Sequence, residues 1–268
     1  MEKTILVTGS TDGIGRLAAE LLLEEGQQVI LHGRNSAKLE ATRRDLLKRF
    51  PTGKVESVQA DLADFSELRK LINMIKENFR RLDVLMNNAG VFKTASIVTA
   101  AGLDVRFMVN NIAPYYLTRQ LLEKIPPNGR IVNVASAAQA PVDLKVLAGK
   151  RRAEDFEAYA QSKLAMIMWT NFLAQRYRDT ARVFVAVNPG SLLGTKMVRE
   201  GFGMSGKDVG IGGEILVRAA LGDEFADANG KYYDNDGKRF APPHPDALDL
   251  EKINAVVKSM EEILSDLH

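Results

Sequence analysis

Short runs rich in β-branched and apolar residues alternate with longer helical segments along most of this chain. A strand followed by a helix and a second strand is the unit that builds a parallel sheet. Most of the runs are continuously apolar, which is typical of strands covered on both faces. The pattern predicts strands at 4–8, 28–32, 55–59, 84–86, 130–135 and 182–187. It predicts helices at 14–25, 37–50, 65–79, 103–125 and 157–178.

The order of these segments predicts an α/β fold with a doubly wound parallel sheet and helices on both of its faces. The chain has 268 residues, an ordinary length for one domain of this class. No repeat, low-complexity tract or linker interrupts it, so we expect residues 1–268 to form a single domain. The glycine-rich segment 194–213 is interpreted as a mobile loop rather than a domain boundary.

Composition argues against several classes of function. The 36 Lys and Arg residues nearly balance the 34 Asp and Glu residues, so nothing indicates a nucleic-acid-binding or anionic-membrane surface. The chain has no Cys, and His32, His244 and His268 lie far apart, so we expect no disulfide, thiol nucleophile or metal site. A strand is predicted almost at Met1, and no apolar stretch approaches the ~20 residues of a membrane span. We therefore expect a cytoplasmic protein that acts on a small molecule, without a membrane or nucleic-acid partner.

A glycine-rich turn lies between the first predicted strand and the first predicted helix. Its glycines allow a tight turn and a close approach of the backbone to a pyrophosphate at the helix N-terminus. This context favours a dinucleotide site over a simple turn, although the spacing is G-x-x-x-G-x-G rather than G-x-G-x-x-G. The cofactor contacts predicted here are Gly9, Ser10, Thr11, Asp12, Gly13, Ile14 and Gly15.

The end of the second predicted strand bears on the choice between NAD and NADP. An acidic residue there would bind the ribose 2′-hydroxyl of NAD, whereas an arginine accommodates the 2′-phosphate of NADP. Residues 31–35 include Arg34 and Asn35 but no Asp or Glu. The sequence therefore predicts NADP(H) in preference to NAD(H), with a solvent-facing Arg34 as the alternative.

Polar and small residues follow the third and fourth predicted strands. Because the carboxyl ends of parallel strands line the ligand crevice, we expect these residues to contact the cofactor. Asp61 would accept a hydrogen bond from the adenine amino group, unless it only caps the helix that follows. The predicted contacts in the two segments are Asp61, Leu62, Asn88, Ala89 and Gly90.

Tyr159 and Lys163 are four residues apart in a predicted helix, which places both side chains on one face. Ionising a free tyrosine at pH ~7 costs about 4 kcal/mol, because its pKa is near ~10. A positive charge at ~4 Å in a partly buried site supplies about that much. The pair therefore indicates a tyrosine tuned as an acid or base, although the same spacing occurs by chance on solvated helices.

Taken together, these residues resemble the short-chain dehydrogenase/reductase family over nearly the whole chain. The resemblance rests on the glycine-rich turn, Asn87-Asn88-Ala89-Gly90, Asn110, Ser136, Tyr159 with Lys163, and Pro189-Gly190. Residues 110–118 and 159–165 are most similar to the retinol-dehydrogenase-like branch. The resemblance implies a Rossmann-type fold, with a homo-oligomer as one expected state.

The resemblance also implies a role for each residue of the catalytic group. Tyr159 would be the proton donor in carbonyl reduction and the acceptor in alcohol oxidation, and Lys163 would lower its pKa and hydrogen-bond the nicotinamide ribose. Ser136 would hold the substrate oxygen and stabilise developing charge. Asn110 would anchor a water that links Lys163 to solvent. Further cofactor contacts are expected at Tyr159, Lys163, Pro189, Gly190, Ser191 and Leu192.

Two segments depart from the family pattern. Ser136 and Tyr159 are 23 positions apart, more than in the family's short forms. The extra polar segment is expected to rim the substrate cleft or to cover a subunit-packing surface, and its basic trio 150–152 is interpreted as a solvated loop rather than a phosphate site. Thr195 lies one position later than the usual threonine, which puts its nicotinamide contact in doubt.

Apolar residues near the expected reaction centre predict a lipophilic aldehyde, ketone or secondary alcohol as substrate, unless they only pack a closed loop. They are Phe92, Ala137, Ala138, Val142, Leu192, Leu193, Met197, Val198, Phe202 and Met204. The predicted function is an NADP(H)-dependent oxidoreductase that interconverts a carbonyl compound and its alcohol. Two alternatives remain open: a non-catalytic NADP-binding sensor or scaffold, and a nucleotide-sugar epimerase or dehydratase.

Overall fold

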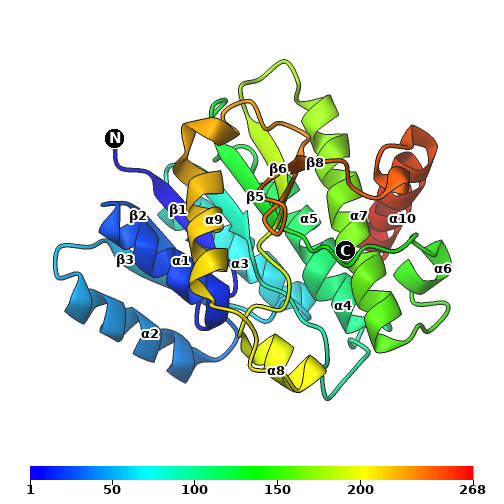
Figure 1. Ribbon diagram of the computed structural model, residues 1–268, viewed down its shortest axis with the longest axis horizontal. Coiled ribbons are helices and arrows are strands. Elements are labelled where there is room, and N and C mark those ends of the chain that lie inside the picture. Colours follow the sequence, from blue (N-terminus) through cyan, green and yellow to red (C-terminus); the bar gives the residue numbers. More distant parts are fainter. Residues whose placement is uncertain (268) are drawn as a thin grey trace.

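The computed structural model describes residues 1–267, and every side chain among them except that of Phe202. One eight-stranded sheet runs through it, in the order β3-β2-β1-β4-β5-β6-β7-β8 (Figure 1). The strands are β1 (Thr4–Val7), β2 (Gln28–Gly33), β3 (Val55–Gln59), β4 (Val84–Asn87), β5 (Arg130–Val134), β6 (Val183–Asn188), β7 (Tyr232–Asp234) and β8 (Arg239–Ala241). Strands β1 to β7 are parallel, and β8 pairs antiparallel with β7.

The predicted doubly wound α/β fold is confirmed. All six predicted strands are present, each within one residue at either end. The sequence did not predict β7 and β8, because three residues are too few to show a strand period. Strand order reverses between β1 and β4, the point at which open α/β sheets bind their ligands.

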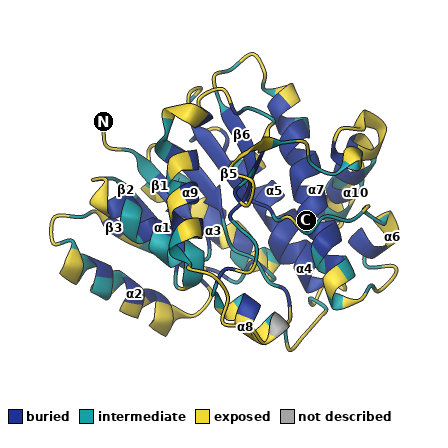
Figure 2. Ribbon diagram, viewed as in Figure 1, coloured by how far each residue is buried: buried dark blue, intermediate teal, exposed yellow. Residues whose placement is uncertain are grey.

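Helices cover both faces of the sheet, which explains why the strands are apolar on both sides (Figure 2). On one face lie α1 (Gly13–Glu24), α2 (Ser36–Arg49) and α9 (Gly210–Leu221). On the other lie α3 (Phe65–Asn78), α5 (Ala113–Leu121) and α7 (Asp155–Arg176). Helix α10 (Leu250–Asp266) packs against α7. Helix α7 is buried almost throughout because the sheet lies on one side of it and α10 on another.

The long helix predicted at 103–125 is interrupted. The segment contains α4 (Val105–Phe107), a π-helical turn at Met108–Ile112, and then α5. Pro114 explains part of the break, because it has no N–H to give to the Asn110 carbonyl four residues earlier. The amide of Ala113 instead donates to Met108, five residues back. Single π turns of this kind occur often at functional sites.

The glycine-rich segment 194–213 is not a continuous loop, which corrects the sequence-based prediction. It contains α8 (Lys196–Phe202), capped by Thr195, and the beginning of α9 at Gly210. Gly203 ends α8 with φ +68°, a conformation that glycine adopts without steric cost.

The extra segment before Tyr159 folds into the short helix α6 (Leu144–Leu147), which packs against α10. It does not rim the cleft described below. The basic trio 150–152 lies in a loop, as the sequence predicted. Arg151 pairs with Asp143 and Glu157, and Arg152 donates to the Gly102 carbonyl.

Candidate active site

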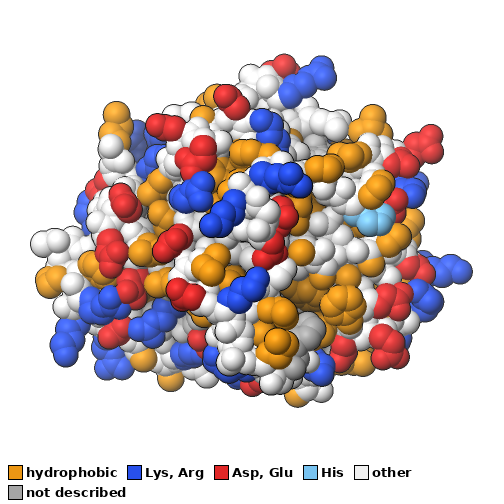
Figure 3. All heavy atoms as spheres, viewed as in Figure 1, with side chains coloured by type: hydrophobic (Ala, Val, Ile, Leu, Met, Phe, Trp, Pro, Cys, Tyr) orange, Lys and Arg blue, Asp and Glu red, His pale blue; other side chains and the backbone are white. Residues whose placement is uncertain are grey.

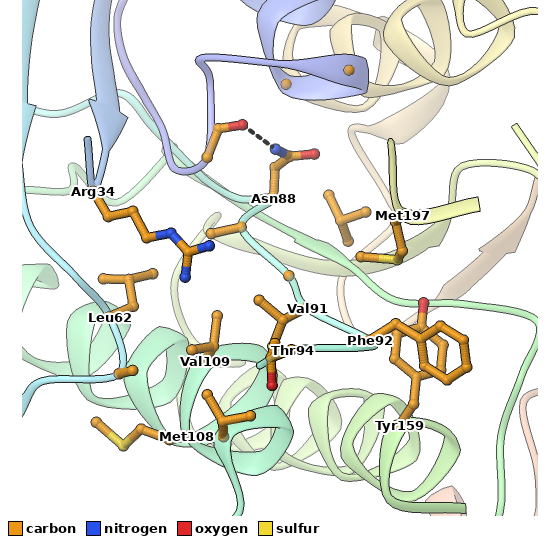
Figure 4. A pocket seen from close by; sticks show the side chains of 18 of the residues that line it. Arg34, Leu62, Asn88, Val91, Phe92, Thr94, Met108, Val109, Tyr159 and Met197 are labelled. Atoms are coloured by element: carbon orange, nitrogen blue, oxygen red, sulfur yellow. Dashed lines mark hydrogen bonds between the residues drawn. The ribbon is translucent and has the colours of Figure 1, made fainter. Parts of the chain in front are cut away.

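A cleft of about 1400 Å³ lies along the carboxyl ends of the parallel strands. Figure 4 shows Arg34 at one end of it and Tyr159 at the other, with Val91, Thr94 and Val109 between them. The cleft is therefore elongated, with a cationic side chain and an acid–base side chain at opposite ends. It is lined by nearly all of the cofactor and catalytic residues predicted from the sequence, the exceptions being Ser10 and Asn110.

The glycines let the backbone of this turn pack tightly on the segment after β4. The missing side chains leave room for a ligand. A Cβ at Gly9, whose φ is +65°, would lie 2.8 Å from Ala89 Cα, and one at Gly15 would lie 2.2 Å from Asn88 Nδ2. Asn88 Nδ2 donates to the carbonyls of Thr8 and Gly9 at 2.9 and 3.1 Å. The N-terminus of α1 faces the cleft just beyond this turn, as a pyrophosphate-binding site requires.

Ser10 is completely buried and takes no part in lining the cleft. Its hydroxyl accepts from the His32 amide at 2.9 Å and so ties the glycine turn to β2. The prediction of a cofactor contact by the Ser10 side chain therefore finds no support in its position.

His32 supports the same turn from β2. It was not identified from the sequence as a site residue. Its Nδ1 accepts from the Gly9 amide at 3.1 Å, and its Nε2 lies 3.1 Å from the Ala60 carbonyl. Burial lowers the pKa of His32 to about 4. The neutral ring with its proton on Nε2 satisfies both contacts.

The Arg34 end of the cleft carries two cations and a carboxylate. The exposed Arg34 guanidinium forms no ion pair among the described residues, whereas Lys38 pairs with Asp12 at 2.6 Å. The bond from Lys38, opposed by burial, holds the pKa of Asp12 below its usual range. Asn35 caps α2, so its side chain accepts from the Lys38 amide. Arg34 therefore remains available to an anion at this end.

Asp61 lies at the wall of the cleft but does not cap α3. Asp64 is the N-cap, and Asp61 Oδ1 accepts from the Ala63 amide at 2.9 Å. The alternative interpretation of Asp61 as a helix cap is therefore wrong, and its second carboxylate oxygen accepts no hydrogen bond from the described residues. Leu62 lines the same wall.

Ser136, Tyr159 and Lys163 meet at the other end of the cleft. Ser136 follows β5, and its side chain forms a hydrogen bond with that of Tyr159. Lys163 Nζ lies 5.8 Å from the centre of the Tyr159 ring. It donates to the Val134 carbonyl at 2.6 Å. The sequence-based expectation that these three residues share one site is consistent with this arrangement.

The pKa of Tyr159 differs from the expectation. Burial raises it above its usual value, and the hydrogen bond from Ser136 opposes the rise only in part. Burial also lowers the pKa of Lys163 to about 8, so its ammonium is destabilised in the site although it remains the main form at neutral pH. Tyr159 is therefore held in its protonated form at neutral pH. The sequence could not reveal this, because the degree of burial was unknown.

Asn110 lies behind the catalytic group rather than in the cleft. Its side chain accepts from the Val91 amide at 2.8 Å and donates to the Val91 carbonyl at 2.9 Å. It also donates at 3.1 Å to Ser162, whose hydroxyl donates to the Tyr159 carbonyl at 2.7 Å. Asn110 thus fixes α7 at the turn that carries Tyr159. A Cβ built on Gly90 would lie near both Asn110 Oδ1 and Lys163 Nζ, at 3.5 and 3.6 Å.

The segment after β6 is held by residues that sequence reasoning missed. Both donors of Ser191, its amide and its hydroxyl, point to Asp236 in the turn between β7 and β8. Leu192 has φ +55°, which only a constrained turn imposes on such a residue. Thr195 lines the cleft, and its hydroxyl accepts from the Val198 amide as the cap of α8.

The wall beside Tyr159 is aromatic and aliphatic. The Phe92 ring meets the Tyr159 ring edge-on with centroids 5.3 Å apart. The centre of the Phe156 ring lies 6.4 Å from that of Phe92. Figure 3 shows hydrophobic side chains gathered around a hollow near α8 and the start of α7. Of the residues predicted to form this wall, the structure brings together Phe92, Ala137, Ala138, Leu192, Leu193, Met197 and Val198. Val142 and Met204 do not line it, and the Phe202 side chain lies outside the described residues.

These features fit a nicotinamide dinucleotide. The glycine turn leaves space where side chains would clash, α1 presents its N-terminus, and the cleft extends from Arg34 to Tyr159. When bound, such a cofactor supplies or accepts a hydride, while the protein supplies orientation and protons. A parallel sheet with this cleft and this Ser–Tyr–Lys group defines a nucleotide-dependent oxidoreductase.

Comparisons with known proteins agree with this class. The family model for short chain dehydrogenases matches residues 3–204. Human retinol dehydrogenase 13 is 32% identical over 268 residues, covering 93% of this chain and 80% of the relative. Short-chain dehydrogenase chry4 of Gibberella zeae is 33% identical, covering 97% and 96%. A short-chain dehydrogenase structure from Shigella flexneri, complexed with NADP, has a TM-score of 0.70 at 26% identity, covering 87% of this chain and 97% of its own.

The chain therefore belongs to the short-chain dehydrogenase/reductase family, in its retinol-dehydrogenase-like branch. It is an oxidoreductase that acts on a small molecule. Within residues 1–267, no helix combines the length and apolar character needed to cross a membrane. The same residues contain no cluster of His, Asp or Glu side chains suited to a metal ion.

Proposed function

We propose that this enzyme reduces a lipophilic aldehyde or ketone with NADPH, using Tyr159 as the proton donor. The observation that carries the proposal is the Ser136–Tyr159–Lys163 group at one end of a cleft whose other end presents an unpaired Arg34. The apolar wall formed by Phe92 and its neighbours supports a lipophilic substrate.

Each residue has a defined task in the proposed reaction. Ser136 donates a hydrogen bond to the substrate oxygen and stabilises the charge that develops there. Tyr159 then gives up its phenolic proton to that oxygen, which a raised pKa favours because a general acid must hold its proton beforehand. Lys163 offsets the negative charge left on the tyrosine, and Asn110 holds α7 in register through Ser162.

The preference for NADPH rests on charge. Arg34 matches the 2′-phosphate of NADP, and residues 31–35 contain no carboxylate to bind a ribose hydroxyl. The Shigella flexneri relative complexed with NADP supports this preference by analogy. Reversing the charge with Arg34→Asp should abolish the preference for NADPH over NADH.

A steady-state screen tests the proposal. NADPH and NADH are each offered with lipophilic and with small charged carbonyl compounds, and the wild type is compared with Tyr159→Phe and Arg34→Asp. We expect turnover of lipophilic carbonyls with NADPH, loss of turnover in Tyr159→Phe, and loss of the preference for NADPH over NADH in Arg34→Asp. If no carbonyl compound oxidises NADPH, a non-catalytic NADP sensor is favoured instead, and activity on nucleotide sugars would favour an epimerase or dehydratase. Full turnover by Tyr159→Phe would exclude Tyr159 as the proton donor.

A further inference from the structure

The turn between β7 and β8 is joined to the cleft by a set of hydrogen bonds centred on Asp236. The Ser191 amide lies 3.0 Å from both carboxylate oxygens, and the Ser191 hydroxyl donates to Oδ2 at 2.5 Å. Asn188 Nδ2 donates to Oδ2 at 2.9 Å. Although burial opposes it, these donors hold the pKa of Asp236 below its usual range, so the group is a carboxylate at neutral pH.

The same carboxylate reaches the far end of the segment that Ser191 begins. Lys207 Nζ lies 3.6 Å from Asp236 Oδ1. The Lys207 amide donates to the Leu192 carbonyl, and the Gly194 amide to the Lys207 carbonyl, each at 2.7 Å. Residues 191–207, which we call the flap, therefore form a closed loop whose two ends both meet Asp236.

The flap carries α8 and much of the cleft wall. Thr195, Met197 and Val198 line the cleft, and a Cβ on Gly13 would lie 3.4 Å from Thr195 Cγ2. The flap therefore approaches the glycine turn on one side and the wall beside Tyr159 on the other. Asp236 does not line the cleft, so any effect that it has on a ligand must pass through Ser191, Asn188 or Lys207.

We propose that Asp236 is a positioning residue that holds the flap in the conformation that receives the cofactor. The carboxylate fixes Ser191 immediately after Gly190 and ties the flap's other end through Lys207. Without it, the two donors of Ser191 and the Asn188 side-chain amide lose their shared acceptor, and the flap is no longer tied to the turn between β7 and β8, while the fold's core is unchanged. This inference rests on the proposed use of a nicotinamide cofactor and goes beyond it in naming what holds the flap.

Cofactor binding and proteolysis test the role without relying on turnover. The variants are Asp236→Ala, Asp236→Asn, which retains one acceptor oxygen, and Lys207→Gln. The matched control is Asp227→Asn, an exposed carboxylate without an ion pair among the described residues. NADPH dissociation constants are measured by fluorescence titration. Tryptic cleavage within the flap at Lys196 and Arg199, which all variants retain, is measured with and without saturating NADPH.

We expect Asp236→Ala to weaken NADPH binding about tenfold, with Asp236→Asn intermediate, because charge-assisted hydrogen bonds are lost. Flap cleavage should accelerate and saturating NADPH should suppress it, and KM for NADPH should rise more than kcat falls. Unchanged NADPH affinity and unchanged cleavage in Asp236→Ala would overturn the proposal. If Asp236→Ala fails to fold, the same comparison in Asp236→Asn decides. If the wild type binds NADPH but reduces no carbonyl compound, the proposed function is refuted, while the binding and proteolysis test of Asp236 remains valid.

Discussion

Lys163 Nζ donates a hydrogen bond to the Val134 carbonyl, 2.6 Å away at the carboxyl end of β5. The ammonium is 3% exposed and has no carboxylate beside it, so burial lowers its pKa to about 8. The lysine that we propose to assist catalysis is thus held by a backbone dipole at the end of a strand rather than by an ion pair. The protein accepts a destabilising buried charge at the point where the proposed reaction needs one.

This relationship predicts a pH-dependent cost in stability. In the unfolded chain Lys163 binds its proton as the pH falls through about 10.5, whereas in the folded protein it does so only near pH 8. The free energy of unfolding therefore decreases as the pH falls from 10.5 to 8 and is constant below that range. Urea unfolding of wild type and Lys163→Met should show the wild type gaining about 2 kcal/mol relative to the variant between pH 7 and 10. Parallel curves would show that the two states share one lysine pKa. Tyrosine titrations occur in both proteins and cancel in the difference.

His32 predicts a loss of stability of the same sign in the acid range. Burial lowers its pKa to about 4, so between pH 6.5 and 4 the unfolded chain binds a proton that the folded protein does not. The free energy of unfolding should fall by about 3 kcal/mol across this window and level off below it. His32→Gln retains hydrogen-bonding atoms but cannot titrate, so its acid curve should lack this component. Equal losses of stability in wild type and His32→Gln between pH 6.5 and 4 would contradict a neutral, buried His32 ring in the folded protein.

The first six strands, the first helices and the glycine turn could be predicted from the sequence because local patterns specify them. Gly9 and Gly15 lie between an apolar run and a helix, and steric contact with Ala89 and Asn88 explains why glycine is needed. The four residues proposed for catalysis were expected from the family resemblance, with the Tyr159–Lys163 spacing as an independent signal, and the structure places Ser136, Tyr159 and Lys163 together with Asn110 directly behind them.

Other features depend on contacts that local patterns do not encode. Asp236 acts on Ser191 across 45 positions from the turn after a three-residue strand, which is too short for any periodicity to reveal. The π turn at Asn110 looks like ordinary helix in sequence, although Pro114 was a visible signal of a break. The direction of the Tyr159 pKa shift depended on burial, which the Tyr–Lys spacing alone could not supply.

Helix α8 packs on the aromatic wall through a glycine, which makes a steric prediction possible. A Cβ at Gly201 would lie 2.6 Å from Phe92 Cδ1, and that ring packs against Tyr159. Gly201→Ala should therefore displace α8 or Phe92 and lower kcat/KM, with an overpacking cost of about 1–3 kcal/mol reduced by alanine's better helix propensity. The double variant Phe92→Ala/Gly201→Ala should recover part of the loss in a double-mutant cycle. Additive effects of the two substitutions on kcat/KM would refute the contact.

Arg106 links the segment before the π turn to the first turn of the catalytic helix. It is 1% exposed and donates to both oxygens of Asp104, itself 2% exposed, and to Asp155 at the start of α7, which is 45% exposed. Removing the guanidinium leaves the Asp104 carboxylate buried without its partner, whereas the Asp155 carboxylate can be solvated. The cost of losing Arg106 should therefore come almost wholly from Asp104. Arg106→Leu should destabilise the fold by about 3–5 kcal/mol, whereas Asp155→Asn should cost less than about 1 kcal/mol.

The decisive comparison is Asp104→Asn/Arg106→Leu, because asparagine can still accept from the Arg106 backbone amide that Asp104 Oδ1 now caps. If the stranded charge is the main cost, this double variant should recover at least about half of the stability lost in Arg106→Leu, measured by urea unfolding at pH 7. A double variant as unstable as Arg106→Leu would assign the loss to packing of the arginine stem instead.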